Sequence, residues 1–402
     1  MSQRSPLLPI FLIVLVDVLG FTIVIPLLTL YAQKFGASDV VATTLVTVYA
    51  ACSFLSTPVI GRLSDRYGRK PLLLISQAGT CAGFIVLGSA NALWMVFLGR
   101  VLDGITAGNL ATAQAYISDH TKPENRAKAF GIIGVAFGVG FMFGPGLGGW
   151  LGNAYGMHYP FILSASLSAL SIICTWTLLP SGRPPQAADQ PAAAPGGKRP
   201  GVFDFAVYRD YFSRPGLARL YVQFTLFTFA FSAFTSGFAL FAEERFGWSE
   251  RQTGYLFMYA GFVGIILQGG LIGRLVKKFG EVKLGLAGFA AAMVGYFLLG
   301  FANTVGLLVL VATINGFGNG VLRPVLTSLV TQRVGRHEQG TAIGISGSLS
   351  SLAMTAAPVT GGMMLQYVST MAWALVPATV ALIGLFVAIG SRPRTAAAAP
   401  AT

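Results

Sequence analysis

The chain has 402 residues, of which 54% are hydrophobic and only 10% are charged, and its formal net charge is +13. Soluble domains average about 25% charged residues, so this composition excludes a water-soluble globular protein and indicates a chain solvated by lipid. The basic residues lie in short loops between apolar runs, which argues against nucleic acid as a partner.

Twelve apolar runs are long enough to cross a hydrocarbon core of about 30 Å, which takes about 20 residues per helix. They cover residues 8–31, 40–60, 71–90, 92–118, 127–151, 159–179, 217–242, 252–273, 283–302, 304–330, 340–366 and 371–390. Lys and Arg outside these runs gather in the loops on one side, and the other side holds only Lys34, Arg245 and Arg251. The predicted fold is all-α, with twelve transmembrane helices and both termini in the cytoplasm.

Asp17 lies in the first span, eight residues after Pro9 and therefore roughly 12 Å along the helix. A charged carboxylate at such a depth costs about 2.5–3.5 kcal/mol, and no nearby structural feature requires it. Asp17 is therefore predicted to take up and release a proton. The alternative is a structural ion pair with Arg100.

The segment 61–70 (GRLSDRYGRK) carries four positive charges between two apolar runs. Its glycine, Asp and Arg spacing resembles the loop 2–3 signature of the major facilitator superfamily of transporters. The resemblance implies a gate, in which Asp65 pairs across the interface between two halves on the cytoplasmic side and holds the outward-facing state. The predicted gating residues are Gly61, Asp65, Arg66, Gly68, Arg69 and Arg126.

The fourth span holds Arg100 and Asp103, three residues apart and therefore on one helical face. Arg100 resembles the span 4 arginine of the superfamily, which is associated with proton coupling. The alternative is a self-neutralising Arg–Asp pair, and both interpretations can hold together. Asn109 and Gln114 follow in the same span and are predicted to line the substrate cavity.

The fifth span contains glycines around a Gly-Pro pair, where small residues allow close helix packing and proline bends the helix. This pattern resembles the antiporter signature in span 5 of drug/proton antiporters, and it favours export over uptake. The alternative is ordinary packing of small residues. The residues of the motif are Gly131, Gly140, Gly144, Pro145, Gly148 and Gly149.

Residues 180–200 are rich in Pro, Ala and Gly and are predicted to be a disordered cytoplasmic linker. Residues 203–212 combine aromatic and charged residues and suit a segment in the membrane interface. The seventh span, which follows, is rich in phenylalanine. Phe231 and Phe234 are its candidates for a wall that stacks on an aromatic or cationic drug, although most phenylalanines here are expected to pack or to meet lipid.

The tenth span carries Asn315, Asn319 and Arg323, each four residues apart, which predicts one polar stripe. A polar stripe is favoured where it lines water over where it meets lipid. The stripe either binds substrate or lines the cytoplasmic path, and both alternatives remain open.

The two halves of the chain repeat each other. The segment 144–149 (GPGLGG) returns as 357–362 (APVTGG), and 61–68 (GRLSDRYG) returns as 273–280 (GRLVKKFG) at nearly the same offset. The predicted organisation is an N-terminal six-helix bundle at 1–179, a linker at 180–214 and a C-terminal six-helix bundle at 215–402. Two pseudo-symmetric bundles around a midplane cavity are the architecture that the superfamily resemblance implies.

Within the superfamily, the chain is similar to the tetracycline/proton antiporters in 17–26 (DVLGFTIVIP), 93–100 (LWMVFLGR) and 241–248 (FAEERFGW). The tetracycline antiporters have acids within spans 3 and 9, whereas the matching stretches 76–88 and 284–295 contain none here. Asp103 and Arg323, conversely, stand where uncharged residues are expected. We therefore expect aromatic compounds that are neutral or weakly cationic to be exported better than tetracycline, without a divalent metal.

The function expected is proton-coupled antiport that exports amphipathic drugs or metabolites. The alternatives are a uniporter or symporter for a small organic solute and, from another class, a non-transporting membrane receptor. No nucleotide-binding or catalytic motif appears, so we expect no enzyme activity, no metal and no cofactor, and a proton gradient as the energy source. The expected partners are the small-molecule substrate, protons and membrane lipids, for a monomer in a bacterial cytoplasmic (inner) membrane.

Overall fold

The computed structural model describes residues 7–120, 126–179, 205–214, 216–335 and 338–390, and their regular structure is entirely helical. The N-terminal half contains α1 (Leu7–Val24), α2 (Leu28–Gln33), α3 (Asp39–Tyr67), α4 (Arg69–Gly88), α5 (Leu93–Ile105), α6 (Asn109–His120), α7 (Arg126–Tyr155) and α8 (His158–Leu178). The C-terminal half contains α10 (Phe205–Ser213), α11 (Leu217–Phe246), α12 (Glu250–Ile266), the π-helical turn η2 (Leu267–Leu271), α13 (Ile272–Phe279), α14 (Glu281–Gly300), α15 (Val305–Gln332), α16 (Gln339–Tyr367) and α17 (Thr370–Gly390).

Nine helices in the described part of the chain are long and apolar enough to cross a membrane. The other three predicted spans are interrupted rather than continuous helices. The first divides into α1 and α2 next to Pro26, which disfavours helical backbone in the residue before it. The fourth divides into α5 and α6 before Gly108, and the eighth passes through η2, which contains Gly269 and Gly270.

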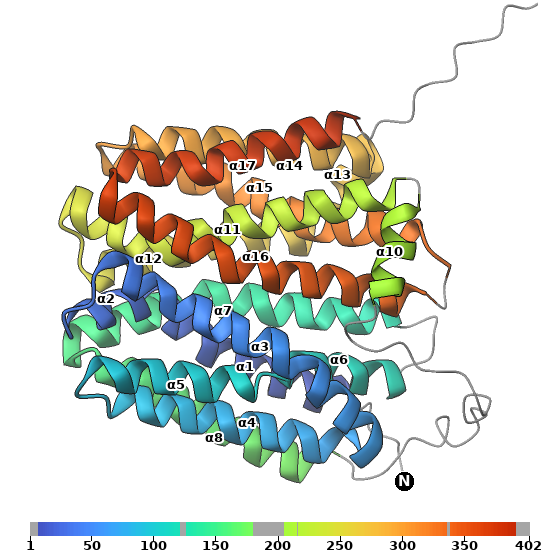
Figure 1. Ribbon diagram of the computed structural model, residues 1–402, viewed down its shortest axis with the longest axis horizontal. Coiled ribbons are helices and arrows are strands. Elements are labelled where there is room, and N and C mark those ends of the chain that lie inside the picture. The colour runs from blue at the N-terminus through green and yellow to red at the C-terminus, as the bar shows by residue number, and fades with distance from the viewer. Residues whose placement is uncertain (1–6, 121–125, 180–204, 215, 336–337, 391–402) are drawn as a thin grey trace, which may run out of the picture.

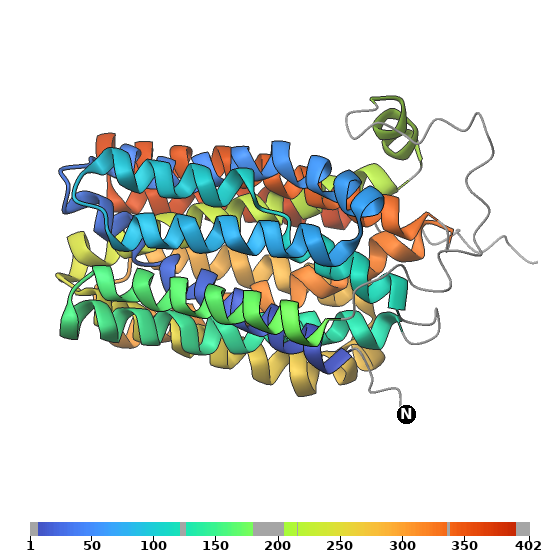
Figure 2. The ribbon, with the colours of Figure 1, turned by 90° about the horizontal axis from the view of Figure 1, so that it is seen from below.

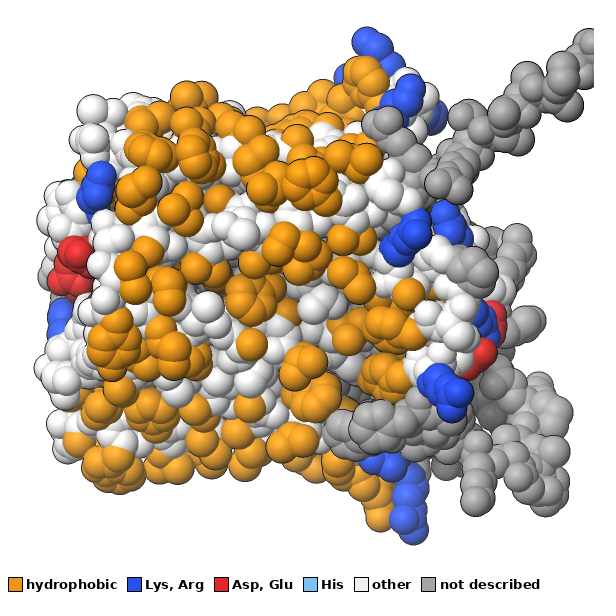
Figure 3. Space-filling view, turned by 45° about the horizontal axis from the view of Figure 1, so that its top comes forward, with side chains coloured by type: hydrophobic (Ala, Val, Ile, Leu, Met, Phe, Trp, Pro, Cys, Tyr) orange, Lys and Arg blue, Asp and Glu red, His pale blue; other side chains and the backbone are white. Residues whose placement is uncertain are grey.

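The long helices run along one common axis in two perpendicular views (Figures 1 and 2). A wide hydrophobic band covers the face seen in Figure 3, and charged side chains are confined to its two ends. Large apolar side chains stand fully outside, as at Trp94 (65% exposed), Trp176 (70%) and Phe386 (64%). An apolar surface of this extent is costly in water, so the band is the surface that meets lipid.

Helix α10 lies across the end of the bundle, perpendicular to the long helices, as Figures 1 and 2 together show. It covers most of the segment predicted to lie in the interface. Arg214, directly after it, contacts both oxygens of Glu338 at 3.0 and 2.9 Å and Asp210 at 2.6 Å. The adjacent Arg214 guanidinium holds the pKa of Glu338 below its usual range. This ion pairing fastens α10 to the start of α16.

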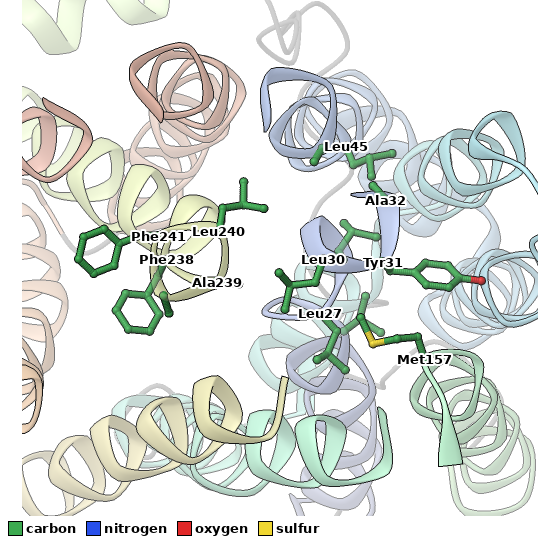
Figure 4. Close-up of a cluster of buried hydrophobic side chains, with 14 of the residues drawn as sticks. Leu27, Leu30, Tyr31, Ala32, Leu45, Met157, Phe238, Ala239, Leu240 and Phe241 are labelled. Carbon is green, nitrogen blue, oxygen red and sulfur yellow. The ribbon is translucent and has the colours of Figure 1, made fainter. Parts of the chain in front are cut away.

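One hydrophobic cluster joins the two halves at the end of the molecule that holds α2. In Figure 4, Leu240 of α11 points toward Leu30 of α2, while Phe241 and Tyr31 point away from each other into their own halves of the same cluster. Toward the opposite end, the core divides into separate clusters. One belongs to the N-terminal half and includes Ile13 and Tyr116, and two belong to the C-terminal half, one with Tyr221 and the other with Val321.

Polar contacts between the halves follow the same division. Near the α2 end, the Val40 amide donates to Gln366 Oε1 at 3.1 Å, and the Thr47 hydroxyl donates to the Thr355 carbonyl oxygen at 2.7 Å. Gly61 lies about four turns after Thr47 on α3, and Gly344 lies about three turns before Thr355 on α16. A Cβ added at either glycine would meet nothing within 4 Å. These polar contacts between α3 and α16 therefore lie at the α2 end, and the two glycines further toward the end that holds the N-terminus face open space.

Candidate functional site

Asp17 lies in α1 beside two buried polar side chains of the N-terminal half. The Gln77 amide nitrogen is 3.5 Å from Asp17 Oδ2 and donates to Ser171 Oγ at 2.7 Å. Asp17 Oδ1 is buried and has no hydrogen-bond partner. No Lys or Arg of the described residues forms an ion pair with Asp17, so the predicted alternative of an Asp17–Arg100 pair is not what the structure shows. A carboxyl group with one unpartnered oxygen has room for a proton.

Arg100 and Asp103 form a buried ion pair on α5, with 2.9 Å between Arg100 Nη1 and Asp103 Oδ2. Both residues are 3% exposed, and the Arg100 guanidinium lies 4.3 Å from the ring centre of Tyr49 on α3. Pairing and stacking lower the cost of burying this arginine. The predicted self-neutralising pair is therefore present, while a role in proton coupling stays a prediction.

The break between α5 and α6 is held by hydroxyl groups from α3. Ser56 donates to the Gly104 carbonyl oxygen at 2.8 Å, and Thr57 donates to the Ala107 carbonyl oxygen at 2.7 Å. These bonds add side-chain donors to carbonyl groups at the interruption, where the Gly104 carbonyl oxygen also accepts from the Ala107 amide at 3.2 Å. Asn109 begins α6 directly after the break, and its buried Oδ1 has no partner. Gln114 lies further along α6 and is half-buried.

The two predicted phenylalanines have different surroundings. The Phe231 ring of α11 lies 6.4 Å from Phe141 of α7, so it stands where the two halves meet. The Phe234 ring packs inside the C-terminal half, against Tyr296 at 5.4 Å and Trp373 at 6.3 Å. Phe231 thus has the position that a drug wall requires, whereas Phe234 follows the alternative of core packing.

The three polar residues of α15 do not form one common lining. Asn315 is 3% exposed, and its amide packs against Gly295 of α14 without a hydrogen bond. Asn319 exchanges hydrogen bonds with the Tyr296 hydroxyl at 3.2 and 3.4 Å. Arg323 is exposed and reaches across to the N-terminal half, 5.4 Å from the ring centre of Phe137. The predicted stripe is therefore wrong at Asn315, because the tight approach of α14 buries its amide.

The glycine-rich motif of α7 packs against two different helices. A side chain at Gly140, Gly144 or Gly148 would meet α1, with Thr22 Oγ1 at 2.2 Å from a Cβ at Gly144. On another face, a Cβ at Gly149 would lie 2.3 Å from the Glu250 carbonyl oxygen of α12. Pro145 lies in the same stretch, and a Cβ at Gly254 of α12 would lie 2.3 Å from its carbonyl oxygen. The sixth residue of the motif, Gly131, lies earlier in α7. The motif therefore fixes α7 to α1 and to the other half at once.

The two repeated turns have the same backbone feature. Gly68 between α3 and α4 has φ +99°, and Gly280 between α13 and α14 has φ +78°. Glycine adopts this conformation without steric cost, which explains its presence at both turns. Arg69 donates to Ser64 Oγ at 2.7 Å, and Arg66 lies over the neighbouring Tyr67 ring. The predicted roles of the Asp65 and Arg126 side chains lie outside the described parts of the structure.

Sequence reasoning missed an ion pair between the halves at the α2 end. Lys34 Nζ lies 3.3 Å from Glu250 Oε1, beside the Gly149 contact. The sequence did offer one indication of this pair, because Lys34 is one of only three basic residues in the loops on that side of the predicted membrane. Gln77 and Ser171 were also missed, although a glutamine within an apolar run is itself unusual. No group of three or more His, Cys, Asp or Glu among the described residues is arranged to hold a metal ion.

Comparison with known proteins assigns the fold. A family model described as Major Facilitator Superfamily matches residues 10–280 and 269–402. The chain is 31% identical over 362 residues to the class C tetracycline resistance protein of Escherichia coli, which covers 89% of each chain. It is 27% identical over 348 residues to multidrug resistance protein 1 of Bacillus subtilis (strain 168), which covers 86% of each.

Among solved structures, that of the human organic anion transporter MFSD10 (TETRAN) matches with a TM-score of 0.75 at 22% identity. The match covers 96% of this chain and 100% of that one, and at this identity it bears on the fold alone. The all-α membrane fold predicted from the sequence is confirmed. The chain belongs to the Major Facilitator Superfamily, as a multi-pass membrane transporter with drug-efflux relatives, and it is not an enzyme.

Proposed function

We propose that the protein is a proton-coupled antiporter that exports amphipathic drugs or metabolites by alternating access. The observation that carries this proposal is the Asp17 carboxyl group, which is embedded in α1, free of any described ion pair, and left with one unpartnered oxygen. An acid inside a membrane span is energetically costly, so its presence indicates a role in transport. Proton binding at Asp17 removes a buried charge, which can change the relative stability of the two conformations.

The arrangement of the halves supports a loading step from the side that holds the N-terminus, which we assign to the cytoplasm from the distribution of Lys and Arg. Substrate enters while the halves are apart at that end, next to Phe231 and Arg323. The α2 end must then open, which requires the Lys34–Glu250 ion pair and the contacts of α3 with α16 to separate. Rocking of one half against the other accomplishes both movements.

Asp17 and the Arg100–Asp103 pair lie in the same half, so proton binding acts on the half that carries α7. In this scheme the outward-facing state releases substrate and takes up a proton at Asp17, and the protonated protein returns to the inward-facing state without substrate. The inward-facing state then releases the proton and binds substrate. A ligand or proton can shift this equilibrium only by binding the two states differently. The scheme places the protein as a monomer in a bacterial inner membrane, with both termini in the cytoplasm.

A second candidate is a uniporter or symporter for a small organic anion. It is favoured by Arg323, which is exposed and faces the other half without a described acid partner. This candidate predicts that acidic substrates are moved without an opposing proton flux.

Inverted membrane vesicles with an acidic lumen test the two candidates directly. Proton antiport predicts that a cationic aromatic dye accumulates in the lumen, that its entry raises the luminal pH, and that a protonophore abolishes accumulation. Vesicles without the protein provide the control. Dye entry that is unaffected by the protonophore, or accumulation of organic anions without proton movement, would contradict antiport.

A further inference from the structure

The turn between α13 and α14 repeats the turn between α3 and α4, but its charges are changed. The glycines at 61, 68, 273 and 280 align the two segments, and both turns end on a glycine with positive φ. Where the first turn has Asp65, the second has Lys277, and where the first has Arg69, the second has Glu281. The acid of the C-terminal turn therefore lies after the glycine, at Glu281, instead of among the cations before it.

In the N-terminal turn, two of the four basic side chains, Arg69 and Lys70, donate hydrogen bonds to groups of the protein. Arg69 donates to Ser64 Oγ at 2.7 Å. Lys70 Nζ donates to the carbonyl oxygens of Trp176 and Leu179, both at 2.7 Å, at the end of α8. These bonds use the cations of this turn to fasten neighbouring helices.

The cations of α13 have no such role. Arg274, Lys277 and Lys278 are exposed and lie three and four residues apart, so they share one side, which we call the basic face of α13. Among the described residues, none of the three forms an ion pair with a carboxylate, and Lys278 lies over the ring of Phe279 at 5.4 Å. The opposite side packs inward through the half-buried Ile272, Leu275 and Val276.

The carboxylate next to this face is already occupied. Glu281 accepts hydrogen bonds from Ser328 at 2.7 Å and from Gln332 at 2.9 Å, both on α15. The cations of α13 are therefore exposed without a described carboxylate partner and are available to an anion from outside the chain.

We infer that the basic face of α13 binds the headgroups of anionic phospholipids. Helix α13 extends the eighth span at the end that holds the N-terminus in Figure 1, where Lys and Arg side chains also gather in Figure 3. Exposed apolar side chains flank the cations, as Leu271 (41% exposed) and Phe279 (48%). Cations beside apolar groups at a membrane surface match an anionic headgroup with its acyl chains. The inference rests on the orientation assigned in the proposed function, which places this surface in the cytoplasmic leaflet.

The test measures the melting temperature of the full-length protein in neutral detergent while phosphatidylglycerol is titrated in. Phosphatidylcholine and inorganic phosphate are titrated in parallel. The test variant combines Lys277→Gln with Lys278→Gln, and a second variant, Lys277→Asp, copies the charge of the N-terminal turn. The matched control is Arg251→Gln, which removes an exposed cation from the opposite end of the same span.

Phosphatidylglycerol is expected to raise the melting temperature, whereas phosphatidylcholine and phosphate are not. Each cation near an anionic surface strengthens binding about fivefold, so the double variant should need roughly 25-fold more phosphatidylglycerol for the same shift. Lys277→Asp should weaken the response similarly, and Arg251→Gln should respond as the unmodified protein does.

Equal titrations for the double variant and the unmodified protein would overturn the inference, as would an equal loss in Arg251→Gln. If inorganic phosphate raised the melting temperature as much as the lipid does, the basic face would bind a soluble anion. That result would contradict the lipid assignment. The measurement involves neither a proton gradient nor drug transport, so its failure would leave the proposed antiport untouched.

Discussion

Thr22 Oγ1 of α1 lies within hydrogen-bond distance, 2.9 Å, of the Gly140 carbonyl oxygen of α7. This contact needs an empty position at Gly144, one turn later, because a Cβ there would lie 2.2 Å from Thr22 Oγ1 and 3.0 Å from the Ile23 backbone nitrogen. The helix that carries Asp17 is thus held in register with the helix that contacts the other half. In the proposed mechanism, this contact is where a change at Asp17 on α1 would reach α7.

Gly144→Ala is expected to destabilise the protein by about 1–3 kcal/mol, because the backbone of α1 cannot move aside as a flexible side chain can. Transport should fall with it, since α1 shifts relative to α7. Thermal melting and dye transport measure the two effects. Gly344→Ala is the control, because its Cβ would meet nothing within 4 Å. If both variants had the same melting temperature and the same rate of dye transport, the glycine motif would be ordinary helix packing.

Paired cysteines in a background without Cys52, Cys81 and Cys174 should report the closed end of the molecule. Val40→Cys with Gln366→Cys replaces two residues that are neighbours across the interface, where the Val40 backbone nitrogen lies 3.1 Å from Gln366 Oε1. Its disulfide should form readily and stop transport, because the α2 end can no longer open, and reduction should restore activity. Gly61→Cys with Gly344→Cys should form little disulfide in the resting protein. Faster cross-linking of this second pair would mean that the halves close at the other end.

Much of the fold could be predicted because lipid leaves few alternatives. Every span must satisfy its own backbone, so apolar length predicts the helices. The interruptions at Pro26, Gly108 and Gly269–Gly270 were harder to predict, because proline and glycine also occur inside intact membrane helices. Here α7 contains Pro145 without ending, and α16 contains Pro358.

The candidate site was predictable in its charged members and less so in its neutral ones. Asp17 and Arg100 stand out because charges within spans are rare. Gln77 and Ser171 contact the Asp17 region through their position on α4 and α8, which the sequence of α1 cannot reveal. Asn315 is a case in which the sequence predicted the wrong surroundings. Its helical spacing from Arg323 predicted a shared face, but its amide packs against Gly295 of α14, which has no side chain.

Substrate preference should follow from the scarcity of embedded acids. Asp103 is neutralised by Arg100, and Phe231 and Phe141 offer aromatic faces where the halves meet. We expect a cationic or neutral aromatic dye to be transported faster than tetracycline, and magnesium to have no effect. Uptake of both labelled compounds into inverted vesicles, with and without magnesium, measures this. Strong magnesium-dependent tetracycline uptake with little dye transport would overturn the substrate prediction while leaving antiport intact.

The Asp17→Asn variant tests the central claim most directly, since it keeps the size of the side chain and removes its proton. The measurement compares dye accumulation driven by a pH gradient with dye exchange at equal pH, in vesicles with matched protein levels. Asp39→Asn is the control, because that carboxylate already accepts a hydrogen bond from Gln33 at 2.9 Å near the α2 end. We predict that Asp17→Asn loses gradient-driven accumulation at every pH, keeps exchange, and makes exchange independent of pH. Full gradient-driven accumulation by Asp17→Asn would contradict the assignment of Asp17 as the proton-carrying group.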